Sequence, residues 1–196
     1  VPGHSDELGY GKLNAHRALL NAQLLNSSTL DLMVKDSNDD LGIQPNTISQ
    51  YPWASNDIWI RNFNDGLLEH QNPEYSATTP NYAYIRITNK SCVYTASNNS
   101  VTLYWAKAGT SLNWPSTWNG SSYFSNDALM GNVIGTVTIP TLAPGEEKII
   151  SMPFLVPNPA DYNFFGSDAW HFCLLARIES NDDPMTLPET NDLVSN

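Results

Sequence analysis

Positive charge is scarce in this chain. Of 196 residues, 9 are Lys or Arg and 20 are Asp or Glu, which gives a formal net charge of −11. An acidic chain repels nucleic acid and anionic membrane surfaces, so we expect neither as a partner. No apolar run is long enough to span a bilayer, so we expect no membrane insertion. The acidity suits an exported soluble protein, or one that binds Ca²⁺.

Cysteine and histidine are also rare. The two cysteines, Cys92 and Cys173, show no CxxC spacing, which excludes the usual zinc and redox motifs. A disulfide between strands would suit an exported protein. In an immunoglobulin-like topology, however, the two positions fall at opposite ends of the sandwich, too far apart to bond. The histidines are dispersed and form no HxH or HxxxH pair.

What the chain does have is a strong alternation of apolar residues. Such alternation over 81–88 and 101–106 predicts two long strands, with Trp105 as the central packing residue. The same pattern predicts five more strands, over 30–34, 58–60, 133–139, 150–154 and 172–178. We therefore predict a mainly β fold, an immunoglobulin-like antiparallel β-sandwich of about seven strands. Two long loops, 36–56 and 112–131, are the places where such a sandwich would contact ligands.

One helix is predicted, at the N-terminus. Leu13, Leu20 and several alanines recur at helical spacing between Ser5 and Asn26. A single amphipathic helix cannot bury its apolar stripe alone. It therefore packs on the sandwich or belongs to a neighbouring part of a longer protein.

The segment GYGKLNAHRALLNA (9–22) resembles the end of the catalytic domain in subtilisin-like serine peptidases, where a GYG-x-x-(N/D)-A motif opens the last helix. From Leu30 onward the chain resembles the β-sandwich extension of some bacterial subtilases. The phrases that carry this are DIWIRN (57–62), HQNPEY (70–75), PNYAYIRITNKS (80–91), LYWAKAGTSLNWP (103–115), NPADY (158–162) and HFCLLARIESNDDPMTLPET (171–190). The resemblance implies that 1–28 is a catalytic-domain remnant and 29–196 an accessory domain. It also implies a secreted or cell-surface bacterial protein whose partner is its own upstream catalytic domain.

Asp36, His70 and Ser111 occur in the order Asp, His, Ser that subtilases use. A nucleophilic serine needs a rigid turn or helix start beside an oxyanion hole, whereas Ser111 leads from a strand into a loop. His70 lacks the glycine of the family's HGT motif, and the family's nucleophile precedes the GYG helix. We therefore predict no catalytic residues and no peptidase activity in this chain.

Two loops carry candidate binding residues. Asp36, Asn38 and Asp40 alternate before Gly42, and Asp57 could complete an oxygen shell for Ca²⁺. The alternative is an Asx-rich turn, which the same residues form without metal.

The second loop is rich in aromatic residues: Trp114, Trp118, Tyr123 and Phe124. Exposed rings would form a platform for a glycan or a protein ligand. The alternative is a loop folded over the sandwich and pinned by its own rings. The first functional hypothesis is thus a non-catalytic accessory domain that stabilises, positions or tethers a catalytic domain. The second is a carbohydrate or cell-surface binding module.

Overall fold

The computed structural model describes residues 30–42, 54–93, 95, 98–109 and 112–184, and every structural statement below refers to these residues. The helix predicted for 5–26 lies outside them. The described elements are strands β1 (Leu32–Met33), β2 (Ile58–Arg61), β3 (Asn81–Asn89), β4 (Ser100–Lys107), β5 (Gly131–Thr138), β6 (Glu147–Phe154) and β7 (Phe172–Glu179), with a 3₁₀ helix η1 (Pro159–Asp168) before β7.

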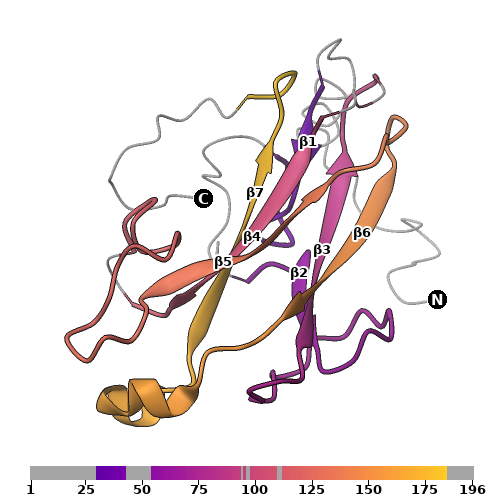
Figure 1. The fold of residues 1–196 in the computed structure, drawn as a ribbon. Helices are drawn as coiled ribbons and strands as arrows, with labels where there is room; N and C mark the ends of the chain where they lie inside the picture. The colour runs from indigo at the N-terminus through magenta and orange to yellow at the C-terminus, as the bar shows by residue number, and fades with distance from the viewer. Residues whose placement is uncertain (1–29, 43–53, 94, 96–97, 110–111, 185–196) are drawn as a thin grey trace, which may run out of the picture.

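The strands form two antiparallel sheets that face each other (Figure 1). In one, β3 pairs with β6 along its length, while β1 and β2 share its other edge. In the second sheet, β4 lies between β5 and β7. The β3–β6 and β4–β7 pairs bring together strands that are not consecutive, as in an immunoglobulin-like sandwich. The predicted seven-stranded β-sandwich is confirmed.

The first strand is shorter than predicted. The alternation over 30–34 predicts five residues, but only Leu32 and Met33 pair with β3. After them the backbone turns aside, because the Lys35 amide donates to Asp57 Oδ2 at 3.1 Å rather than to a strand.

The core lies between the sheets, as the alternation predicts. Ala83, Ile85 and Ile87 of β3 are fully buried, and Val101 and Leu103 of β4 meet them from the other sheet. Each large side chain buried in this way contributes roughly 1.5–3 kcal/mol. Trp105 packs edge-on against Tyr162 and Phe172, with ring centroids 6.5 and 5.7 Å apart, which confirms its central place.

The outer face of β4 is also buried, which the alternation did not predict. Tyr104 and Ala106 on this face form a second apolar cluster with Leu175 and Trp118. Trp118 comes from the loop between β4 and β5, which therefore folds back over the sheet. A strand that reads as half-buried is thus covered on both faces.

Both cysteines are free thiols. Cys173 pairs with Ala106 near the end of β4, whereas Cys92 lies three residues beyond the end of β3 at Asn89, in the connection that leads to the start of β4. The two lie toward opposite ends of the sandwich, as the predicted topology requires. Burial raises the pKa of the Cys173 thiol.

Candidate functional site

The residues of the rejected Asp–His–Ser set have the following places. Ser111 lies outside the described residues. His70 Nδ1 accepts the Ile60 amide at 3.2 Å, which gives the ring a structural role at the edge of β2. The other described histidine, His171, has its Nδ1 3.3 Å from Asp168 Oδ1. Within the described part of the chain, neither His70 nor His171 makes a hydrogen bond to a serine.

The Asp36–Gly42 loop is a hydrogen-bonded turn. Asp40 accepts the Gly42 amide at 2.7 Å and the Asp36 amide at 3.3 Å, and Asn38 accepts from Asn56. Within the described ranges, no three His, Cys, Asp or Glu side chains form a group that could hold a metal ion. The contacts are those of the Asx-rich turn, and a calcium site here stays a prediction.

The fourth proposed calcium ligand, Asp57, has other partners. Its carboxylate accepts Arg86 Nη1 at 3.2 Å as well as the Lys35 amide. Burial raises the pKa of Asp57 despite the nearby Arg86. Asp57 therefore serves to join β1, β2 and β3.

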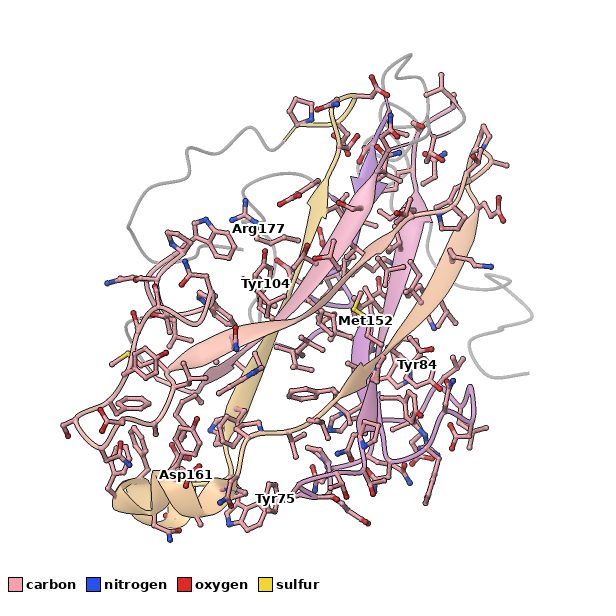
Figure 2. All side chains as sticks on the ribbon, viewed as in Figure 1. Tyr75, Tyr84, Tyr104, Met152, Asp161 and Arg177 are labelled. Atoms are coloured by element: carbon pink, nitrogen blue, oxygen red, sulfur yellow. The ribbon has the colours of Figure 1, made fainter. Side chains whose placement is uncertain are left out.

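Most rings of the aromatic loop pack against the sandwich. Trp118 is only 4% exposed. The Trp114 ring stands edge-on to that of Tyr104, with centroids 5.3 Å apart, and the Arg177 guanidinium lies 3.8 Å from the Trp114 centroid. Figure 2 labels Tyr104 and Arg177 on this side of the sandwich. Phe124 packs edge-on against Tyr162 and both phenylalanines of η1. Of the four predicted binding residues only Tyr123 is exposed. These contacts are those of the alternative given above, a loop pinned to the sandwich by its own rings, and a binding role for the loop stays a prediction.

A different segment has the features of a contact surface, the β2–β3 loop (residues 62–80). The Arg61 guanidinium holds Asp65 through Nε and Nη2, and its Nη1 donates to the Glu69 carbonyl at 2.8 Å. Trp59 Nε1 donates to the Leu67 carbonyl at 2.9 Å. The hydrogen bonds from the Arg61 guanidinium lower the pKa of the Asp65 carboxyl. The first half of the loop is thus fixed to β2 by side chains of that strand.

The β3 strand holds the same loop from its other side. Tyr84 stacks on Trp59 with centroids 5.4 Å apart, and its hydroxyl accepts the Gly66 amide and donates to Asn64. Further along the loop, Asn81 exchanges two hydrogen bonds with the Glu74 backbone. The loop is long but ordered by polar contacts.

Three apolar side chains project from this ordered loop. Phe63 is 70% exposed, Leu67 55% and Leu68 58%. Large apolar groups held exposed on an ordered surface segment are a feature of contact sites for other molecules. The motif DIWIRN contains Trp59 and Arg61, the residues that hold the loop, but nothing local in the sequence shows that the apolar side chains face outward.

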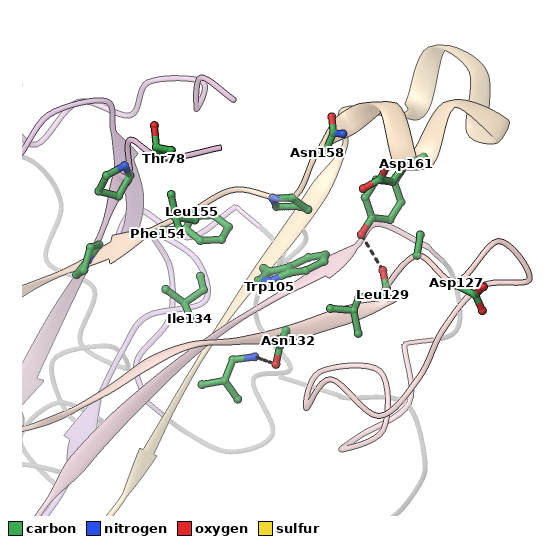
Figure 3. Close-up of a pocket in the computed structure, with 16 residues that line it drawn as sticks. Thr78, Trp105, Asp127, Leu129, Asn132, Ile134, Phe154, Leu155, Asn158 and Asp161 are labelled. Carbon is green, nitrogen blue, oxygen red and sulfur yellow. Dashed lines mark hydrogen bonds between the residues drawn. The ribbon is translucent and has the colours of Figure 1, made fainter. Parts of the chain in front are cut away.

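A groove of about 730 Å³, called here the β5–β6 groove, opens where the two sheets diverge (Figure 3). One wall is β5 with Asn132, Val133 and Ile134, and the other is the end of β6 with Pro153 and Leu155. Trp105 lies at its floor. Tyr162 closes one end, donating from its hydroxyl to the Leu129 carbonyl at 2.8 Å. Burial raises the pKa of Tyr162 to about 12.

Sequence reasoning missed both η1 and this groove. Asn158 caps η1 by accepting the Ala160 amide, and Pro159 starts it, a cap-and-proline signal that the sequence contains. The groove has no such signal, because its walls come from segments far apart in the chain. Within the described residues, no helix is long and apolar enough to cross a membrane. No protein-family model and no curated protein matches this chain.

Proposed function

We propose that this chain is a non-catalytic accessory domain of an exported subtilisin-like serine endopeptidase, and that it positions the catalytic domain by docking through the β2–β3 loop. The observation that carries the docking role is the rigid presentation of Phe63, Leu67 and Leu68, which are all more than half exposed. The parentage rests on the resemblance of GYGKLNAHRALLNA to the last catalytic-domain helix.

The physical basis for docking is preorganisation. A loop already held by Arg61, Trp59 and Tyr84 loses little conformational entropy when a partner covers it. The apolar side chains then gain roughly 25 cal/mol for each Å² of apolar surface removed from water. A loop whose only role was connection would gain nothing from exposing them.

Two measurements test the parentage and the lack of catalysis. The coding sequence upstream of Val1 should contain the Asp, His and Ser motifs of a subtilase. The purified chain should leave casein intact. Casein turnover that a serine-directed inhibitor blocks would overturn the non-catalytic assignment, and an upstream sequence without those motifs would overturn the parentage.

The docking surface is tested in the longer protein. Replacing Phe63, Leu67 and Leu68 together by Ser should lower the melting temperature of the catalytic domain while leaving that of the isolated chain unchanged. Ile149→Ser, at an exposed apolar residue of β6, is the matched control. Equal effects of the two variants on the catalytic domain would rule out this docking surface.

The carbohydrate-binding alternative is less well supported, because burial of Trp118 removes a central ring of the expected platform. Tyr123 carries the one exposed ring of the four. Binding to a glycan array that is lost in the Tyr123→Ala variant would support the carbohydrate-binding alternative.

A further inference from the structure

Aliphatic side chains form part of the accessible surface of the β5–β6 groove. Val133 is 41% and Leu155 55% exposed, and Pro153 is exposed beside them. Figure 3 shows Phe154 and Leu155 on the β6 side of the opening and Ile134 on the β5 side. The exposed apolar surface that the groove presents to a ligand is therefore aliphatic rather than aromatic.

The aromatic side chains of the groove are not available for stacking. Trp105, Phe154 and Tyr162 are all buried, and Trp105 and Tyr162 contact other rings in the core. Sugar rings are bound in proteins by open aromatic faces. An oligosaccharide would find none here, whereas Leu, Val or Pro side chains of a peptide would pack against Val133, Pro153 and Leu155.

The charge of the groove has a single sign. Asp127 and Asp161 line one end, both exposed, and no Lys or Arg is among the described lining residues. Neither carboxylate forms a salt bridge or accepts a hydrogen bond within the described part of the chain, although the backbone of Asp161 accepts from Asn126 Nδ2 at 2.8 Å. Tyr162 is uncharged at neutral pH, so the two aspartates set the potential. Electrostatic complementarity then selects a positively charged partner.

The walls are fixed before any ligand arrives. The Asn126 bond ties the turn that carries Asp127 to η1, and the Tyr162 hydroxyl ties η1 to Leu129. On β5 the register shifts opposite Leu103 and Tyr104, which leaves Ile134 as an extra residue in a β-bulge. Bulges of this kind redirect side chains, and Ile134 lines the groove.

We propose that the β5–β6 groove binds an extended peptide in which Lys or Arg alternates with aliphatic residues or proline. The aliphatic residues pack against Val133, Pro153 and Leu155, and the basic side chains pair with Asp127 and Asp161. Thr78 and Pro80, at the end of the β2–β3 loop, also line the groove, but the docking residues Phe63, Leu67 and Leu68 do not. The test of this site does not depend on the parentage of the chain.

Fluorescence anisotropy with the whole chain tests this proposal. The probe is a fluorescein-labelled peptide with the unit Pro-Leu-Lys-Val repeated twice, and the control peptide has Glu in place of Lys. We expect saturable binding of the basic peptide only, weakened in high salt. The double variant Asp127→Asn, Asp161→Asn should weaken binding about fivefold, the sum expected of two exposed ion pairs. Asp182→Asn, at an exposed aspartate beyond β7, should leave it unchanged.

A second variant separates the apolar contribution. Leu155→Ser removes an exposed side chain, so the fold should persist while affinity for the basic peptide falls. Three outcomes would overturn the proposal: no binding of the basic peptide, equal binding of the acidic peptide, or affinity unchanged in both the double variant and Leu155→Ser. Displacement of the peptide by a soluble oligosaccharide, but not by unlabelled peptide, would instead identify the groove as a glycan site and also overturn it.

Discussion

Arg61 and Asp65, four residues apart, face each other as a guanidinium and a carboxylate joined by three hydrogen bonds, of which Nη2 to Oδ2 is the shortest at 2.8 Å. The remaining nitrogen of Arg61 donates to Glu69, so one planar group fixes two turns of the β2–β3 loop. A lysine has a single nitrogen and cannot reproduce this fork.

We therefore predict that Arg61→Lys loosens the loop without unfolding the sandwich. Hydrogen exchange should become several-fold faster at the Leu67 amide, which donates to Asp65, while the amides of β3 keep their protection. Arg177→Lys, whose side chain lies over Trp114, is the matched control and should leave the loop unchanged. Unchanged exchange at Leu67 in Arg61→Lys would show that the fork does not order the loop.

Asn89 is a second fixed point, at the end of β3. Its side chain is fully buried, donates to the Val93, Leu142 and Ala143 carbonyls, and accepts from Ser91. Asn89→Ala should lower the free energy of unfolding by about 3 kcal/mol, because buried polar groups lose partners. Asn89→Asp should cost more, since it places a carboxylate among three carbonyl oxygens.

Urea denaturation measures both effects. Asn163→Ala, at an exposed asparagine of η1, provides the control and should change the stability by less than about 0.5 kcal/mol. If Asn89→Asp proved as stable as the wild type, the amide orientation inferred from the hydrogen bonds would be wrong.

The strands were predictable because the period of a strand is fixed by its backbone geometry. Ala83, Ile85 and Ile87 face one side wherever the strand pairs, so alternation alone identified the core. The burial of Trp118 was not predictable from the sequence. It depends on contacts with Tyr104, Ala106 and Leu175, and Leu175 is far from Trp118 in the sequence. The β5–β6 groove depends on the same kind of long-range contact, because its walls come from segments far apart in the chain.

Lys107 offers a test of buried charge. Its side chain is 1% exposed, and Nζ donates to the His171 carbonyl at 2.8 Å and lies 3.7 Å from Asp168. The His171 carbonyl also accepts the Ala108 amide, and Asp168 is half exposed to water. Neither group is therefore left without a hydrogen-bond partner if Lys107 is replaced. Lys107→Met should change stability by less than about 1 kcal/mol.

Lys107→Ala should behave differently, because it removes a fully buried side chain, whose Nζ lies over the Phe165 and Phe172 rings, and so leaves a cavity. We expect a loss of about 2–4 kcal/mol in thermal or urea unfolding. Equal losses in the Met and Ala variants would show that the ammonium group, rather than the packing of its stem, holds η1 against β4.

Gly131, the first residue of β5, lies where two segments approach closely. A Cβ atom there would stand 2.4 Å from both the Thr117 and the Trp105 carbonyl oxygens, which are backbone atoms and cannot move aside alone. Gly131→Ala should therefore cost about 3 kcal/mol of unfolding free energy. Gly135→Ala is the control in the same strand: its Cβ would meet only the flexible Met152 Sδ at 3.4 Å, and the cost should stay below about 1 kcal/mol.

The environment of His70 leads to a prediction of how the free energy of unfolding changes in mild acid. Burial lowers its pKa below the ordinary 6.5, and its Nδ1 accepts the Ile60 amide only when neutral. The stability that His70 contributes is therefore complete above pH 6.5 and is lost as the pH falls through the folded-state pKa. His70→Gln should flatten this loss in urea midpoints measured from pH 7.5 to 5.

The comparison with the wild type is needed because three carboxyls change the stability in the opposite direction to His70 as the pH falls. Burial raises the pKa values of Asp31, Asp57 and Asp183 above 3.8, so protonating them on acidification stabilises the fold. Both proteins share these carboxyls, and the difference between their pH profiles isolates His70. Parallel profiles would mean that the His70–Ile60 hydrogen bond does not hold the β2–β3 loop against β2 in solution.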